Sequence, residues 1–236
     1  MKTENLNSQL FQLYNKNYSN LQVELNNDDL EEWPALPFLI KLNEDQFNQS
    51  DLKIMFFGQE TNGWIDQNKI GYTVSLEALM DQYYEFCYNG GKEEHGGHFW
   101  NAIKNFMNLL KNKFPTKEIY PIYNNIIKIG KMEEKGRPSL DILHLENKYL
   151  NVIKDELNIL KPDIIIFFTG PNYDDQIELK LGDVIDNKFS IPDFSTRQLC
   201  RVNLNENCIA FRCYHPNFLY RNNIRDYFDS ILKEIN

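Results

Sequence analysis

Three short polar segments carry residue types that can do chemistry, and each adjoins an apolar stretch. The segment GQETN (58–62) follows IMFF, HPN (215–217) follows CIAFRCY, and two asparagines lie in YNNIIK (123–128). A carboxylate such as Glu60 can take a proton or stabilise a cation, and an imidazole such as His215 can stabilise an anion. An asparagine amide both donates and accepts hydrogen bonds, which suits it to reading a polar ligand. Each segment alone is also explained by an ordinary turn or a structural histidine. A functional site is therefore indicated only if all three segments lie at the same edge of the fold.

Apolar stretches that alternate with helical patterns must position these segments. Strands are predicted at 52–58, 118–130 and 163–170, with a hairpin formed by 198–204 and 208–214. Helices are predicted at 4–26, 74–88, 98–114, 144–161 and 225–235. The alternation predicts a single α/β domain over residues 1–236. We expect a three-layer α/β/α sandwich with a central, mainly parallel four-stranded sheet, preceded by N-terminal helices within residues 1–45. Ligands of such sheets bind beyond the carboxyl ends of the strands, which is where the polar segments fall.

The composition is that of a globular protein with no membrane span. The 236 residues fit one large α/β domain, and a hydrophobic fraction of 42% suffices for a sizeable core. No run of about 18 apolar residues occurs. The N-terminal MKTENLNSQL lacks the apolar stretch of a signal peptide, so the cytoplasm is the expected location. The net charge of −9 argues against nucleic-acid binding by bulk electrostatics, but residues 211–225 contain arginines and no acidic residue.

The cysteines and one histidine-containing loop raise the question of a metal site. Cys87, Cys200, Cys208 and Cys213 form no C-x-x-C pair and are predicted to be buried free thiols. In EEHGGH (93–98) the histidines are three residues apart in a glycine-rich stretch. A zinc-binding H-E-x-x-H instead places its histidines four apart on a helix. We therefore expect no metal ion and no cofactor.

The polar segments resemble the motifs of the uracil-DNA glycosylase superfamily. That superfamily has a G-Q-D-P-Y-like motif after its first strand, an asparagine in its second strand and an H-P-S-P-L-like motif after its last. GQETN (58–62), YNNIIK (123–128), LKPDIIIFFTGP (160–171) and HPNFL (215–219) follow in the corresponding order. The resemblance covers about residues 50–235 and implies the uracil-DNA glycosylase-like fold. It also implies hydrolysis of the N-glycosidic bond of a flipped, damaged or deaminated base in DNA.

The resemblance assigns chemical roles to individual residues. Glu60 would orient a water molecule or stabilise the cationic sugar, and His215 would stabilise the departing base. Asn125 would read the edge of the base with its amide, and the neighbouring Asn124 should point the opposite way if both lie in a strand.

Further base and DNA contacts follow from the same resemblance. The other base-binding residues would be Gly58, Gln59, Asn62 and Tyr72. Tyr72 would be the aromatic platform on which the base stacks. The DNA-binding residues would be Asn217, Phe218, Leu219 and Arg221. Leu219 would be the apolar wedge that replaces the flipped base. The chain departs from the family pattern at Thr61, where proline is common, and at Asn217 and Phe218, where serine and proline are common.

These departures leave two other hypotheses open. The chain can be a catalytically silent or repurposed member that binds a nucleotide, a modified base or nucleic acid without cleaving it, or a structural interaction module. Convergence of Glu60, Asn125 and His215 on one pocket would favour an enzyme. An ion pair between Glu60 and a neighbouring arginine would count against catalysis. The expected partner is DNA, or a nucleobase or nucleotide ligand, with no membrane contact, and the oligomeric state stays open.

Overall fold

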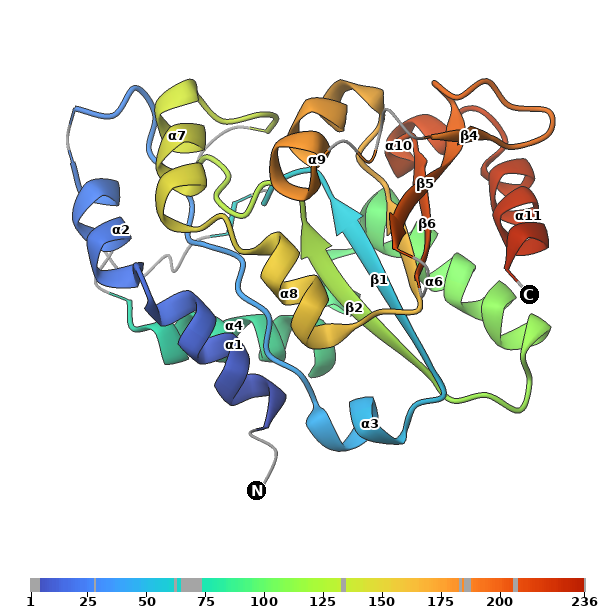
Figure 1. Ribbon diagram of the computed structural model, residues 1–236, viewed down its shortest axis with the longest axis horizontal. Helices are drawn as coiled ribbons and strands as arrows, with labels where there is room; N and C mark the ends of the chain where they lie inside the picture. Colours follow the sequence, from blue (N-terminus) through green and yellow to red (C-terminus); the bar gives the residue numbers. More distant parts are fainter. Residues whose placement is uncertain are drawn as a thin grey trace.

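The computed structural model has an α/β fold (Figure 1). It describes residues 5–27, 29–61, 63–64, 74–132, 135–182, 184, 188–205 and 208–235. Two predicted base-binding residues, Asn62 and Tyr72, lie outside the described residues. Their roles stay predictions.

A six-stranded sheet forms the centre of the molecule. Its strands are β1 (Leu52–Gly58), β2 (Ile119–Asn125), β3 (Ile164–Phe167), β4 (Phe189–Ser190), β5 (Leu199–Asn205) and β6 (Cys208–Cys213). The strand order is β2-β1-β3-β6-β5-β4. The neighbours β2, β1, β3 and β6 run parallel, whereas β5 is antiparallel to both β6 and β4. The sheet is therefore mixed and has two more strands than the predicted four, because β5 and the short β4 extend the edge beyond β6.

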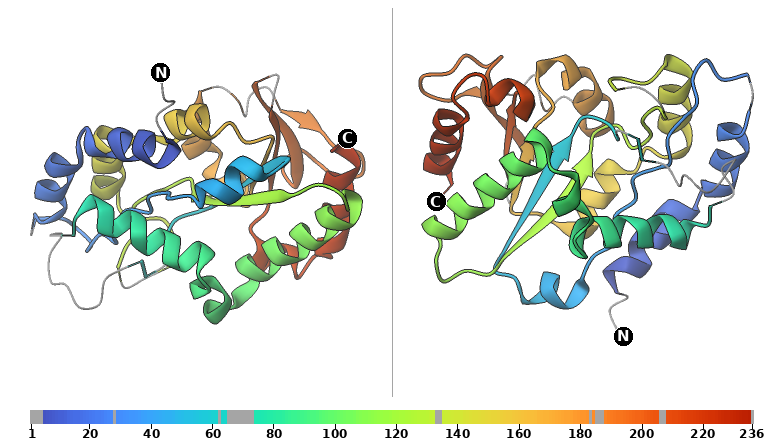
Figure 2. Two further views of the ribbon diagram at one scale, coloured as in Figure 1. Left: turned by 90° about the horizontal axis from the view of Figure 1, so that it is seen from below. Right: turned by 180° about the vertical axis from the view of Figure 1, so that it is seen from behind.

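Apolar side chains on both faces of the central strands require helices on both sides of the sheet. All four residues of β3 are buried, as are Ile54, Met55, Phe56 and Phe57 of β1. Figure 2 shows one helical layer on each side of the sheet.

The helices divide between these two layers. One layer contains α1 (Leu6–Asn15), α2 (Tyr18–Leu25), α7 (Leu140–Tyr149), α8 (Ile153–Leu160) and α9 (Asp174–Leu181). The other contains α4 (Leu76–Tyr88), α6 (Gly97–Lys113) and α11 (Ile224–Glu234). Shorter elements are α3 (Glu44–Gln49), α5 (Gly91–His95), α10 (Pro216–Leu219) and the 3₁₀ turn η1 (Pro171–Tyr173). Phe106 of α6 joins its layer to the sheet through an edge-to-face contact with Phe56 of β1, and it makes a second such contact with Phe228 of α11 within the layer.

Several predicted elements differ in detail. The single helix predicted at 144–161 is two helices, α7 and α8. Leu150 and Val152, which lie between the two helices, are both buried. Side chains two positions apart on a continuous helix do not share a face, so the break in the helix allows both to enter the core. The helices α3, α5 and α9 were not predicted, since their segments are short and polar.

Two further sequence expectations concern cysteines and membranes. All four cysteines are buried and free, as predicted. Among the described helices, none has both the length and the apolar character needed to cross a bilayer.

Candidate active site

The register of the parallel strands brings the polar segments to one edge of the sheet. Gly58, the last residue of β1, lies beside Asn125, the last residue of β2. His215 follows the end of β6 by two residues. Because these strands are parallel, their carboxyl ends meet at the same edge, which is the usual ligand position in such sheets.

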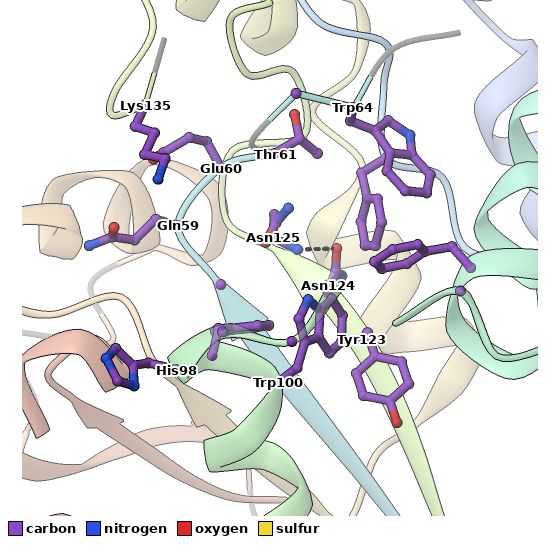
Figure 3. Close-up of a pocket in the computed structure, with 18 of the residues that line it drawn as sticks. Gln59, Glu60, Thr61, Trp64, His98, Trp100, Tyr123, Asn124, Asn125 and Lys135 are labelled. Carbon is purple, nitrogen blue, oxygen red and sulfur yellow. Dashed lines mark hydrogen bonds between the residues drawn. The ribbon is translucent and has the colours of Figure 1, made fainter. Parts of the chain in front are cut away.

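A cavity of about 1140 Å³ opens at this edge. Glu60, Asn125 and His215 all line it, as the glycosylase hypothesis requires. The predicted residues Gly58, Gln59 and Asn217 also line it. In the view of Figure 3, Gln59, Glu60, His98 and Lys135 lie on one side of Asn125, and Trp64, Trp100 and Tyr123 lie on the other. The cavity therefore has a polar half and an aromatic half, with Asn125 between them.

The absence of a side chain at Gly58 makes room for the two groups that would contact a base. A Cβ atom at this position would lie 2.4 Å from Oδ1 of Asn125 and 3.2 Å from Cζ of Phe99. Among the described residues, no side chain or backbone group hydrogen-bonds to the Asn125 amide, so its donor and its acceptor both remain for a ligand. A glycine is thus needed at position 58 because Asn125 and Phe99 approach its backbone closely, and not because the backbone adopts an unusual angle.

Replacing Gly58 with alanine is expected to displace Asn125 and Phe99 and to weaken ligand binding at least about tenfold, because small misplacements of site groups cost that much or more. The measurement is ligand affinity together with the melting temperature. Gly182→Ala is the control for an added methyl group outside the cavity, since nothing lies within 4 Å of its Cβ position, although its φ of +87° adds backbone strain. Unchanged affinity in Gly58→Ala would exclude a ligand position between Asn125 and Phe99.

The adjacent Asn124 points to the other face of the sheet, as predicted. Its Nδ2 donates to Oε2 of Glu156 on α8 at 2.9 Å. Its Oδ1 accepts the backbone N–H of Asn125 at 2.9 Å, so Asn124 fixes the backbone that carries the proposed base reader.

Glu60 is half-buried and is held by a tyrosine that the sequence did not single out. The Tyr173 hydroxyl donates to Oε2 of Glu60 at 2.5 Å. Burial raises the pKa of Glu60, and the Tyr173 bond and the charges of Lys131 and Arg137 oppose this shift in part. Arg137 itself is ion-paired with Asp175. A carboxylate with a raised pKa is a stronger base than an exposed one, which suits the activation of water.

His215 is presented as a neutral ring. Its Nδ1 accepts the backbone N–H of Asn217 at 3.2 Å, so the neutral ring carries its proton on Nε2. Burial, with a smaller effect of His98, lowers the pKa of His215 to about 4. The ring also stacks on Phe99, with ring centres 6.0 Å apart and an interplanar angle of 13°. This environment provides an uncharged N–H donor near neutral pH.

The imidazole signals of His215 are expected to stay unchanged from about pH 8 to pH 5 and to titrate only near pH 4. The unfolded chain takes up this proton near the ordinary value of 6.5 and therefore binds more protons than the folded chain between 6.5 and about 4. The contribution of His215 to stability is thus complete above 6.5 and is lost as the pH falls toward 4. Heteronuclear NMR, with His215→Gln to identify the signals, tests this, and a midpoint near 6.5 would refute the buried neutral ring.

The predicted DNA-contact residues have mixed positions. Asn217 and Arg221 are exposed, and Nε of Arg221 donates to the Asn217 carbonyl at 2.9 Å. Leu219 is fully buried at the end of α10, so its predicted role as a wedge does not fit this conformation. The reason is that HPNFL forms a short helix, which turns Leu219 into the core and leaves Phe218 36% exposed.

Gln59 contributes to the site mainly by holding the strand ends together. Its side-chain Nε2 donates to the Thr169 carbonyl after β3 at 2.7 Å, and its carbonyl accepts the N–H of Ile127 after β2 at 2.9 Å. Thr61, at a position where the superfamily commonly has proline, is buried, and its Oγ1 accepts the N–H of Gly130 at 3.0 Å.

Sequence reasoning missed most of the aromatic half of the cavity. The rings that line it are Phe38, Trp64, Phe86, Phe99, Trp100 and Tyr123. Phe99 and Trp100 lie in the first turn of α6, where only His98 separates them from Gly96 and Gly97. Two aromatic residues close to a glycine pair, at the start of a helix, were an available signal, but the apolar pattern of this segment predicts only a helix.

The described residues contain no group of three or more His, Cys, Asp or Glu placed to hold a metal ion. A scan against protein-family models finds no match for this chain, and a search of the curated proteins finds no match either.

Proposed function

We propose that this chain is a uracil-DNA glycosylase-like enzyme that hydrolyses the N-glycosidic bond of a base flipped out of DNA. The observation that carries the proposal is that Glu60, Asn125 and His215 line one cavity at the carboxyl ends of parallel strands. The four adjacent parallel strands support the sheet implied by the sequence resemblance. The Arg137–Asp175 pair supports it as well, because this arginine has Asp175 as its ion-pair partner, while the Tyr173 hydroxyl donates a hydrogen bond to Glu60.

In the proposed reaction, water attacks C1′ of the sugar while the C1′–N bond breaks. The electron pair of that bond leaves with the base, and Glu60 takes the proton from water. Before the attack is complete, the carboxylate also stabilises the positive charge on the sugar. His215 donates its Nε2–H to the departing base, which accumulates negative charge. The neutral form of His215 is the form present near neutral pH, since burial lowers its pKa to about 4.

Phe99 is a further candidate for the platform role that the sequence resemblance gives to Tyr72, which lies outside the described residues. Phe99 lies within 3.2 Å of the Cβ position of Gly58 and stacks on His215. A base held against Phe99 would present its polar edge to the Asn125 amide. On the DNA side, the exposed Phe218 replaces Leu219 as the candidate wedge, and Arg221 is available to a phosphate.

A silent binder is the second candidate. The net charge of −9 opposes tight binding to duplex DNA, and the raised pKa of Glu60 increases the fraction of the carboxyl that carries a proton. Both features would suit a protein that holds a nucleotide or base without cleaving it.

Incubation with oligonucleotides that carry a panel of damaged bases separates the two candidates. A glycosylase leaves abasic sites, which alkali converts to strand breaks. Abasic sites that disappear in Glu60→Gln and His215→Ala support the proposed roles. Retention of a lesion-bearing strand without abasic sites, in single-stranded and double-stranded form, would favour the silent binder.

A further inference from the structure

The cavity as a whole is larger than the reading of a single pyrimidine requires. Pockets of about 300–1000 Å³ already bury drug-sized ligands, and this cavity reaches about 1140 Å³. We call the set Phe38, Trp64, Phe86, Phe99, Trp100 and Tyr123 the aromatic wall. Asn125 and His215 lie at one end of this wall, so a ligand read by Asn125 has the wall beside it.

The aromatic wall is a continuous arc of rings. Trp64 contacts Phe38 and Phe86 with ring centres 5.0 and 5.2 Å apart. Trp100 contacts Phe86, Phe99 and Tyr123 at 5.3, 5.1 and 5.3 Å. The contacts are edge-to-face, so the wall is fixed in place by its own packing. The faces of such rings are electron-rich and attract cations, most strongly for tryptophan.

The charged residues that line the cavity around the aromatic wall are mostly acidic, which favours a cationic ligand. Among the described residues that line the cavity, the acidic ones are Glu60, Glu85 and Glu94, and the lysine or arginine is Lys135 alone. One ring of the wall already has a cation near its face, from a lysine that is not part of the cavity lining. Nζ of Lys92 lies 5.5 Å from the ring centre of Tyr123.

We infer that the cavity selects a positively charged, N-alkylated purine, stacked on the aromatic wall and balanced by its carboxylates, over a neutral base. The inference rests on the proposed function, since it takes the cavity as the base pocket of a glycosylase. The shared chemistry is the cationic alkylpurine ring, whether it is part of DNA or of a free nucleoside.

The chemistry of the remaining site residues fits such a substrate. When the C1′–N9 bond of a 7-alkylpurine breaks, its electron pair goes to N9 and cancels the charge of the ring. Water supplies the oxygen at C1′ and gives its proton to Glu60. The base leaves as a neutral molecule, so the uncharged N–H of His215 is a sufficient partner for it.

Titration of the whole chain with 7-methylguanosine and with guanosine tests the inference, because the two differ by one methyl group and the charge that it creates. Binding is followed by calorimetry and by quenching of tryptophan fluorescence at mildly acidic pH, where the methylated ring carries a net positive charge. We expect 7-methylguanosine to bind at least about tenfold more tightly. Equal affinities, or no binding of either nucleoside, would overturn the inference.

Variants test whether the aromatic wall and the nearby carboxylates cause the preference for 7-methylguanosine. Trp64→Leu keeps an apolar side chain but removes a ring, and it should reduce the preference for the methylated nucleoside severalfold. Trp33→Leu is the matched control, since Trp33 is 58% exposed and lies outside the cavity lining. Glu85→Gln with Glu94→Gln changes two exposed side chains, whose loss does not threaten folding, and should reduce the preference in the same direction. A preference that survives both changes would overturn the assignment to the aromatic wall.

Cleavage assays keep this inference separate from the proposed function. Matched oligonucleotides that carry 7-methylguanine or uracil, together with free 7-methylguanosine, form the three arms. Faster release of 7-methylguanine from DNA or from the nucleoside supports both conclusions and identifies the source of the substrate. Selective binding of the cation without any cleavage would refute the enzyme and leave the binding inference standing. Cleavage of uracil without preference for the cation would refute only the inference.

Discussion

Replacing Glu60 with glutamine is expected to slow base release by about 100- to 10,000-fold, the range that loss of a general base or acid costs. Glutamine has nearly the same shape and can still accept the hydrogen bond from Tyr173, so the change removes the charge and the basicity without opening the site. Neither the water proton nor the charge of the sugar would then have a partner. Single-turnover cleavage of the best lesion from the panel measures this loss.

The pH profile gives an independent test of the same residue. Because burial raises the pKa of Glu60, the reactive carboxylate forms only above the ordinary value of 4.5, and the wild-type rate should rise with pH through that raised pKa. This rise of the rate with pH should be absent in Glu60→Gln. Glu118→Gln is the matched control, because Glu118 is exposed and precedes β2 at the opposite end of the sheet. A Glu60→Gln enzyme as fast as the wild type would remove Glu60 from the mechanism.

The part of the site that follows strand ends could be predicted from the sequence. Apolar runs of strand length mark β1, β2, β3 and β6, and parallel strands put their carboxyl ends at one edge. The approach of Gly58 to Asn125 is a direct consequence of this arrangement, since they are register partners. Local pattern and topology were sufficient here because every one of these residues lies within two positions of a strand end.

The part of the site that depends on helix packing could not be predicted in this way. The aromatic wall takes Phe86 from α4 and Trp100 from α6, which approach each other only after both helices have packed on the sheet. Tyr173 reaches Glu60 across 113 residues of sequence, and nothing in GPNY distinguishes it from an ordinary core tyrosine. Leu219 shows the same limitation, because a four-residue helix decides which of two neighbouring apolar side chains is exposed.

A second buried polar cluster supports the site from the opposite face of the sheet. Nζ of Lys128 lies 2.6 Å from Oε1 of Glu156, and both side chains are fully buried. Nζ also donates to Oδ1 of Asn124 at 2.6 Å, and the Tyr14 hydroxyl donates to Oε1 of Glu156 at 2.6 Å. Burial lowers the pKa of Lys128, while the charge of Glu156 acts in the opposite direction. The same Asn124 oxygen accepts the backbone N–H of Asn125, so this cluster holds the proposed base reader.

Replacing Lys128 with methionine is expected to lower the free energy of unfolding by about 3–5 kcal/mol, because it leaves the Glu156 carboxylate buried without a countercharge. For a chain of this size the melting temperature should fall by about 6–20 °C. Adding Glu156→Gln removes the second charge and should restore much of the loss, since the cost is that of an unpaired buried ion rather than of a lost attraction. Arg225→Met is the matched control, because the Arg225–Asp229 pair is 61% and 42% exposed and should contribute less than about 1 kcal/mol. If Lys128→Met melts like the wild type, the buried pair does not stabilise the fold. If the double variant is stable but still binds ligand weakly, the lysine acts on Asn125 through Asn124, separately from its effect on stability.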